Sequence, residues 1–410
     1  MFKVHLILSF LLGFLLLTQA RIHPHGKDNK IGFYQLRRGN MELNLTNYGA
    51  TIVSVIVPDK HGNLGDITLG YDDIEQYKND TIYFGALIGR VANRIGHAQF
   101  TLDGHTYNLT VNDHGNTLHG GITGFSDVVW TVESHKEDSH ITFAYNSYDN
   151  EQGFPGRLEV RVTYMLIGTN KYAVKMIARP IDKATPVNLA QHTYWNLGGQ
   201  HGGDILSHEV QIFGSKITPV DDKLIPTGKL ESVKGTPYDF LEPRKVGSRI
   251  HDLPGLYDMN YVLDGNSSKH FRKVVIVKDN VSGRKLELWS NQVGLQFYTS
   301  GMLKHVKGKD GAIYRKYGGI ALETQGFPDA VNHPNFPSQI VRPGETYQHY
   351  MVLREVARKK TAMWIKLESL YMTNLEQQLY SFKWWTKQLA DFNKILDDLE
   401  NIDVELDDVD

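Results

Sequence analysis

A chain of 410 residues is long enough to bury a large core, and a composition of 41% hydrophobic and 22% charged residues with 38 glycines is that of an ordinary globular protein. This composition excludes collagen-like and wholly disordered chains. The formal net charge of −2 provides no broad basic surface, which argues against nucleic acid as a main partner.

The first twenty residues have the pattern of a secretory signal peptide. Lys3 precedes an almost entirely apolar run over residues 4–17, and small residues stand near Ala20, where a signal peptidase would cut. The run is shorter than the ~20 residues that a membrane-spanning helix needs. We therefore expect cleavage after Ala20 and a secreted chain with no membrane anchor. The chain contains no cysteine, so it must fold without disulfides in that oxidising environment.

Five Asn-x-Ser/Thr triplets are compatible with glycosylation in the secretory pathway. They begin at Asn44, Asn79, Asn108, Asn266 and Asn280. Asn44 lies within an apparent strand, so we expect it to be unmodified more often than the loop sites.

Residues 21–357 are expected to form one domain, because no linker, repeat or shift in composition divides them. From residue 32 to about 356 the dominant pattern is an alternation of apolar and polar residues, seen clearly at 159–164, 172–177 and 273–277. Turn sequences such as Asp103-Gly104 separate these runs, and helical periodicity is nearly absent. The fold class expected is all-β, with a large antiparallel β-sandwich.

The pattern changes after residue 358. Over residues 371–399, apolar residues recur at alternating steps of four and three, which predicts a C-terminal α-helical extension of about eight turns. One apolar seam fits self-association or docking to a partner, and equally a helix folded back on its own sandwich. Residues 397–410 hold eight acids and no Lys or Arg, which is typical of a solvated tail.

Three predicted strands place polar side chains where a core face would be apolar. In 186–196, alternation places Asn188, His192, Tyr194 and Asn196 on one face. In the other two, over 319–325 and 293–299, one face carries residues that include the carboxylate Glu323 and the amides Gln325 and Gln296. Side chains of these types favour a ligand rich in hydroxyl groups.

Four segments, in order along the chain, resemble the signature segments of the aldose 1-epimerase family, also called galactose mutarotases. The segments are GRVANRI at 89–95, NTLHGG at 116–121, HTYWNL at 192–197, and ETQ at 323–325 with PDAVN at 328–332. Together they make the resemblance, which spans about residues 32–356, far more specific than any one motif. It implies a β-supersandwich, no cofactor, and an aldose as the small-molecule substrate, with interconversion of the α and β anomers of free hexoses such as galactose and glucose.

The chemistry of ring opening suits the two residues that the resemblance places at the reacting centre. Opening a pyranose ring needs a proton on the ring oxygen and removal of the proton from the anomeric hydroxyl, so the site needs one acid and one base. The resemblance implies that Glu323 is the base and His192 the acid. A neighbouring carboxylate is also expected to favour the protonated form of His192.

The resemblance also implies a set of sugar-binding residues. His119 would orient the sugar near its reacting end, Arg94 would bind hydroxyls with its planar guanidinium, and Asp258 would accept hydrogen bonds from hydroxyls farther away. Gln296 and Asn93 are weaker assignments. The chain departs from the family at Met259, where histidine is usual, which leaves open the hydrogen bonding at Asp258 and the preferred epimer.

Each of these residues also has a purely structural interpretation. Glu323 could be a buried salt-bridge partner, Arg94 and Asp258 could form an ion pair inside the sandwich, and most histidines are surface or satisfied residues. No histidine spacing matches a metal-ligand motif, so no metal is expected. Trp195 is expected in the core, because alternation points it away from His192.

Three other functions fit the sequence less well. A secreted carbohydrate-binding or partner-binding protein without activity would be favoured by degraded catalytic positions, and none is found. A glycoside hydrolase usually needs two carboxylates at the scissile bond, and only Glu323 stands in a convincing position, with Asp258 the other candidate. A phosphosugar epimerase would need basic residues beside the motifs, and these are not seen.

Overall fold

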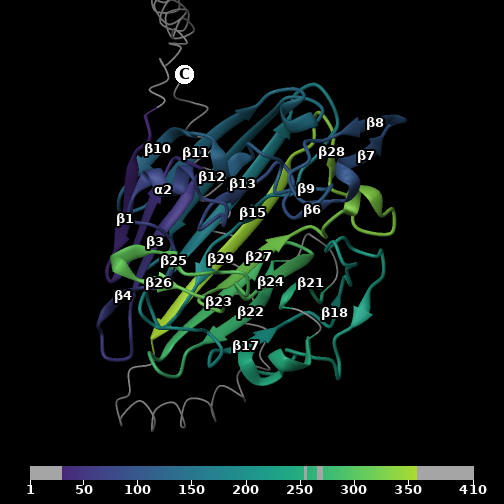
Figure 1. Ribbon diagram of the computed structural model, residues 1–410. Coiled ribbons are helices and arrows are strands. Elements are labelled where there is room, and N and C mark those ends of the chain that lie inside the picture. The colour runs from purple at the N-terminus through teal and green to yellow at the C-terminus, as the bar shows by residue number, and fades with distance from the viewer. Residues whose placement is uncertain (1–29, 254–255, 266–270, 358–410) are drawn as a thin grey trace, which may run out of the picture. The chain divides into compact units, whose positions relative to one another are not determined.

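The computed structural model describes residues 30–253, 256–265 and 271–357, which form one β-rich unit (Figure 1). The expected signal segment and the expected C-terminal helix lie outside the described residues. Within the described ranges, no helix has both the length and the apolar character needed to cross a bilayer.

The largest sheet has nine antiparallel strands and contains all three of the alternating runs singled out in the sequence. Its order is β10-β11-β12-β13-β29-β23-β22-β17-β20. In chain order the strands are β10 (Thr131–Lys136), β11 (His140–Ser147), β12 (Leu158–Leu166), β13 (Lys171–Pro180), β17 (Glu209–Ile212), β20 (Arg244–Lys245), β22 (Arg272–Lys278), β23 (Arg284–Ser290) and β29 (Tyr347–Ala357).

Two further sheets accompany it. The six-stranded sheet has the order β16-β27-β24-β21-β18-β19, and the four-stranded sheet has the order β1-β2-β3-β4. The strands of the first are β16 (Tyr194–Trp195), β18 (Lys216–Ile217), β19 (Glu231–Ser232), β21 (Asp258–Val262), β24 (Gly294–Tyr298) and β27 (Ile320–Gln325), and those of the second are β1 (Phe33–Arg38), β2 (Met41–Thr46), β3 (Thr51–Pro58) and β4 (Leu64–Asp66).

Short strand pairs and helical turns complete the described unit. The pairs are β5 (Leu87–Ile88) with β15 (Ala190–Gln191), β6 (Arg94–Ile95) with β9 (Thr117–Leu118), β7 (Gln99–Leu102) with β8 (His105–Asn108), β14 (Thr185–Pro186) with β28 (Ile340–Val341), and β25 (Val306–Lys307) with β26 (Ile313–Tyr314). The helical segments are α2 (Ile74–Lys78) and the 3-10 turns η1 (Gly96–Ala98), η2 (Phe125–Asp127), η3 (Glu151–Gly153), η4 (Val246–Asp252), η5 (Lys309–Gly311) and η6 (Ala330–Asn332).

A single hydrophobic core joins the three large sheets. Leu43 of β2, Val162 of β12 and Leu295 of β24 are fully buried and belong to the same cluster of apolar side chains. Trp195 lies in this cluster too, as expected from its place in the alternation. The described part of the chain is therefore mostly β, with the sheets packed on a common apolar core.

The prediction of one continuous strand over 186–196 is wrong. Strand β15 ends at Gln191 and β16 begins at Tyr194, because the backbone of His192 bonds instead to the loop at residues 85–86. Asn188 and Asn196 therefore do not line a ligand site through strand alternation. Both are buried, and their side chains bond backbone groups of neighbouring loops.

Candidate active site

His192 and Glu323 meet in the interior of the described unit. Nε2 of His192 lies 3.5 Å from Oε1 of Glu323, and the two residues are 4% and 2% exposed. Glu323 stands inside β27, whereas His192 occupies the gap between β15 and β16. The amide of His192 donates to the carbonyl of Ala86 at 2.9 Å, and its carbonyl accepts from the amide of Gly85 at 3.0 Å, so the backbone is fixed on both sides of the imidazole.

Burial determines the protonation of this pair. It raises the pKa of Glu323 well above its ordinary value, with a further increase from Asp258 and an opposing effect of Arg94. Burial also lowers the pKa of His192 to about 4. The expectation that a carboxylate would favour protonated His192 is therefore wrong, because the loss of hydration on burial outweighs the attraction between the two charges. Both shifts favour the uncharged forms, a carboxylic acid at Glu323 and a neutral imidazole at His192.

His119 lies beside this pair. Its ring lies 5.2 Å from that of His192, centroid to centroid, and the two rings are nearly perpendicular. The amide of Asn93 donates to Nδ1 of His119 at 3.2 Å, and the amide of His119 donates to the carbonyl of Asn93 at 3.0 Å. Because Nδ1 accepts, the proton of the neutral imidazole resides on Nε2. Asn93 thus orients His119 through its backbone and leaves Nε2 as a hydrogen-bond donor.

A metal ion is the other ligand that this cluster could attract. Ligand-type atoms of His119, His192 and Glu323 all lie within 4.8 Å of one another, and two histidines with a carboxylate suit zinc. The hydrogen bond from Asn93 argues against it. A metal needs the lone pair on Nε2 of His119, which would move the proton to Nδ1 and point it at the amide hydrogen of Asn93. The donor set fits a hydroxyl better than a cation.

Arg94 is oriented by a residue that the sequence did not single out. Nε of Arg94 bonds Oδ2 of Asp113 at 2.7 Å, and the other oxygen of Asp113 bonds Nδ1 of His114 at 2.8 Å. Burial alone would raise the pKa of Asp113, but the hydrogen bond from His114 and the charge of Arg94 lower it below its ordinary value. Asp113 therefore stays ionised and holds Arg94. The suggested ion pair of Arg94 with Asp258 does not form; the carboxylate partner is Asp113.

A row of amide side chains extends from Glu323 across the six-stranded sheet. Gln296 of β24 stands opposite Glu323 in register, and its Nε2 donates to Oδ1 of Asp258 at 2.6 Å. Nε2 of Gln325 donates to Oδ1 of Asn260 at 3.2 Å and to Oε1 of Gln296 at 3.4 Å. Asn260 was not predicted, and it joins the row because it lies opposite Gln296 on β21.

Met259 does not disturb this row. It lies opposite Phe297 in register, is 6% exposed and belongs to the main hydrophobic core. Successive residues of a strand point to opposite faces, so Met259 points away from the face that carries Asp258. The substitution of the usual histidine leaves the hydrogen bond between Asp258 and Gln296 in place.

A polar cavity lies beside the row, with about 220 Å³ of empty space that is partly open to solvent. Its lining brings together four of the predicted sugar-binding residues with five others: Asn93, Arg94, Thr218, Val220, Leu224, Asp258, Asn260, Gln296 and Pro328. Because Gln296 also stands opposite Glu323, the cavity lies next to the buried pair of Glu323 and His192.

Comparison with known proteins identifies the family. The family model described as aldose 1-epimerase matches residues 32–354. This chain belongs to the aldose 1-epimerase family. Galactose mutarotase of Homo sapiens is 43% identical to it over 319 residues, which cover 77% of this chain and 91% of that protein. Aldose 1-epimerase of Escherichia coli K12 is 33% identical over 317 residues, which cover 75% and 90%.

A solved structure agrees with these relatives. The crystal structure of an aldose epimerase homologue from C. elegans matches with a TM-score of 0.75 at 27% identity, covering 80% of this chain and 99% of that one. The chain is therefore an isomerase of the aldose 1-epimerase type with the fold of that family, as the four motifs predicted.

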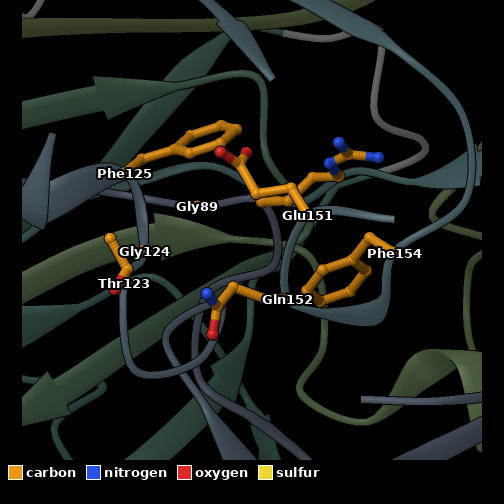
Figure 2. A pocket seen from close by; sticks show the side chains of 9 residues that line it. Gly89, Thr123, Gly124, Phe125, Glu151, Gln152 and Phe154 are labelled. Carbon is orange, nitrogen blue, oxygen red and sulfur yellow. The ribbon is translucent and has the colours of Figure 1, made fainter. Parts of the chain in front are cut away.

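Some motif residues of this epimerase serve the fold rather than the chemistry. Gly120 follows His119 with a φ of +86°, and a Cβ there would lie 2.0 Å from the carbonyl oxygen of Gly89. Only glycine allows this approach. The hollow beside it, lined in part by Glu151 and Phe154, contains none of the predicted site residues (Figure 2). Arg90 also lines it and donates to the carbonyls of residues 155 and 156, so it stabilises loops.

Proposed function

We propose that this epimerase interconverts the α and β anomers of free hexoses, D-galactose and D-glucose, with Glu323 and His192 as the proton-transferring pair. The observation that carries the proposal is the buried contact between these two residues, 3.5 Å apart, beside a cavity lined by amide, carboxylate and guanidinium groups. A carboxylate and an imidazole at this spacing can reach the two oxygens bonded to one anomeric carbon.

The reaction needs one proton to leave the sugar and another to enter it. In the reactive form, a proton has moved from the carboxyl group of Glu323 to His192, so that Glu323 is the carboxylate and His192 the imidazolium. Glu323 takes the proton of the anomeric hydroxyl while His192 donates its proton to the ring oxygen, and the bond between the anomeric carbon and the ring oxygen breaks. Rotation of the aldehyde exposes its other face, and the reverse transfers close the ring as the other anomer. The pair ends with the one proton with which it began.

The remaining residues hold the sugar for this step. Nε2 of His119 donates at the reacting end, and Arg94, held by Asp113, offers donors within the cavity. Asp258 accepts hydrogen bonds from hydroxyls farther from the anomeric carbon, and the side-chain amide of Gln296 donates to them. Because these groups bind the sugar without exchanging its protons, their removal should raise KM more than it lowers kcat.

Polarimetry tests the proposal directly. Freshly dissolved α-D-galactose and α-D-glucose approach their equilibrium rotation spontaneously, and the folded enzyme should accelerate both. Failure to exceed the spontaneous rate with either sugar would overturn the substrate assignment. The ratio of the two values of kcat/KM reports how the groups around Asp258 discriminate the epimers, which differ at one hydroxyl.

We also propose that the enzyme is secreted and glycosylated. The apolar segment over residues 4–17 supports secretion. Asn79, Asn108 and Asn280 are exposed, whereas Asn44 lies in β2 and donates to Oγ of Ser54 at 2.7 Å. The secreted protein should begin at Arg21 in N-terminal sequencing and lose mass on treatment with an N-glycosidase. Retention of residues 1–20 in a protein found only inside cells would overturn this proposal.

The seam over residues 371–399 supports a third proposal, that the full chain self-associates or docks to a partner through this segment. Light scattering of the full chain should give the mass of a dimer, and replacing Leu389 and Leu396 by Asp should restore a monomer. A monomeric full chain would rule out self-association.

A further inference from the structure

His349 is a fully buried titratable residue that the chemistry above does not use. It lies in β29, a central strand of the nine-stranded sheet, and is 0% exposed. Its Nε2 lies 2.8 Å from Oγ1 of Thr324, and its Nδ1 lies 3.1 Å from the carbonyl oxygen of Leu189. One ring thus connects two segments that are far apart in the sequence.

The directions of both hydrogen bonds follow from the chemistry of the partners. A carbonyl oxygen only accepts, so Nδ1 carries the proton and donates to Leu189. Nε2 is then the acceptor, and the hydroxyl of Thr324 donates to it. Burial lowers the pKa of His349 to about 3, so the imidazole is neutral and both bonds persist at any pH at which the enzyme would work.

The two segments that His349 connects are those that carry the reacting pair. Thr324 follows Glu323 directly in β27, and strand alternation points the two side chains to opposite faces. Leu189 stands three residues before His192, immediately ahead of β15. The hydroxyl of Tyr347, also in β29, accepts from the amide of Leu189 at 3.2 Å. Strand β29 therefore bonds Thr324 and Leu189, one in each segment. Glu323 points to the opposite face of β27 from Thr324, where it meets His192.

We propose that His349 is a positioning residue, which fixes the spacing between Glu323 and His192 by bonding Thr324 on one side and Leu189 on the other. The inference rests on the proposed roles of Glu323 and His192. It predicts a specific kinetic effect. Removing either hydrogen bond lets Glu323 and His192 move relative to each other, so kcat falls. The sugar-binding groups at Arg94 and Asp258 are unaffected, so KM is unchanged.

The first variant is Thr324→Val, which removes the donor hydroxyl and keeps the branched shape. Because a displacement of ~1 Å can cost about 10²-fold, we expect a smaller shift to lower kcat about tenfold, with KM within about twofold of the wild type. Thr324→Ser retains the hydroxyl and should restore most of kcat. His349→Asn keeps a donor for Leu189 but cannot reach Thr324, so it should match Thr324→Val, and the double variant should lose no more than either single variant.

Thr142→Val is the matched control. Oγ1 of Thr142 lies 2.9 Å from Oγ1 of Thr163 within the nine-stranded sheet, and Thr142 is 4% exposed. This variant loses a part-buried hydrogen bond between side chains away from the site, so it should lower the melting temperature and leave kcat unchanged.

The inference is overturned if Thr324→Val keeps kcat within twofold of the wild type, if KM rises by the same factor as kcat falls, or if Thr142→Val loses as much kcat. Glu323→Gln, measured in parallel, separates this result from a failure of the proposed function. Full activity in that variant would refute the acid and base roles, whatever the Thr324 variants show.

Discussion

Nε2 of His192 and Oε1 of Glu323 lie 3.5 Å apart, at the limit of a hydrogen bond, with both residues almost wholly removed from solvent. Each loses the hydration that would support a charge, and neither compensates the other through a short bond. Burial therefore favours the uncharged form of each residue. A sugar that presents its anomeric hydroxyl to Glu323 and its ring oxygen to His192 can exchange protons with both.

This state predicts the pH dependence of the reaction. Activity needs one proton on the pair. A second proton is added below the pKa of His192, which is lowered to about 4, and the last is lost only above the raised pKa of Glu323. The profile of kcat/KM, which reports the free enzyme, should have its acid limb near pH 4 and its alkaline limb above the ordinary pKa of a glutamate. An acid limb near pH 6.5, the value of an ordinary histidine, would contradict it.

Asp113 should act on sugar binding through Arg94. Asp113→Ala removes the acceptor 2.7 Å from Nε and frees the guanidinium to reorient. We expect KM for galactose to rise about tenfold, as for loss of one charge-assisted hydrogen bond, with kcat little changed. His114→Ala removes a partner of Asp113 that is itself 87% exposed in its side chain, and should change KM less than twofold. Equal effects of the two variants would refute the role of Asp113.

Glu355 should oppose folding at high pH. It is 5% exposed, and within the described part of the chain neither of its carboxyl oxygens has a hydrogen-bond partner. Burial raises its pKa well above the ordinary value, so the folded state binds the extra proton and stability falls as pH rises above the unfolded pKa of about 4.3. Glu355→Gln should stabilise the protein by about 1 kcal/mol or more at pH 8, measured by urea unfolding at pH 5 and 8.

Glu287 provides the opposite case in the neighbouring strand β23. Its carboxylate lies 2.7 Å from Nζ of Lys285 and 3.2 Å from Nζ of Lys273. Burial alone would raise the pKa of Glu287, but these cations lower it below the ordinary value. Ionised Glu287 therefore stabilises the folded state above the unfolded pKa, and this stabilisation is lost as pH falls. Glu287→Gln should destabilise at pH 8. If Glu355→Gln also lowers the stability of the protein at pH 8, the raised pKa assigned to Glu355 is contradicted.

Metal chelation should leave the reaction unchanged. Because the amide of Asn93 donates to Nδ1 of His119, the lone pair that a metal would need on Nε2 is occupied by a proton. Enzyme dialysed against a strong chelator should keep its kcat, and a stoichiometric zinc content that parallels activity would show that His119 adopts the other tautomer.

The sequence predicted the strands better than the site. Alternation located β12, β13 and β22, because a period of two is characteristic of strands. It did not show that both faces of β13 are buried over residues 172–177. It also placed Glu323 inside a strand. His192 was predicted from its motif and from strand alternation. The alternation was wrong there, because hydrogen bonds to a loop about a hundred residues earlier interrupt the strand.

Residues that act through others left no signal in the sequence. Asp113 lies in a tight turn, where aspartate is common for local reasons, and its contact with Arg94 appears only when β6 pairs with β9. His349 lies in β29 and bonds residues 25 and 160 positions away along the chain. Such contacts depend on the order of strands in the sheets, which no local pattern encodes.

The most direct test of the account is the mutarotation rate of Glu323→Gln, followed by polarimetry on α-D-galactose with the wild type and Thr142→Val alongside. Glutamine keeps the shape of Glu323 and cannot take the proton of the anomeric hydroxyl, so kcat should fall by at least about 10²-fold in a protein that folds normally by circular dichroism. A folded Glu323→Gln enzyme within about tenfold of the wild-type rate would show that the pair with His192 does not carry the reaction.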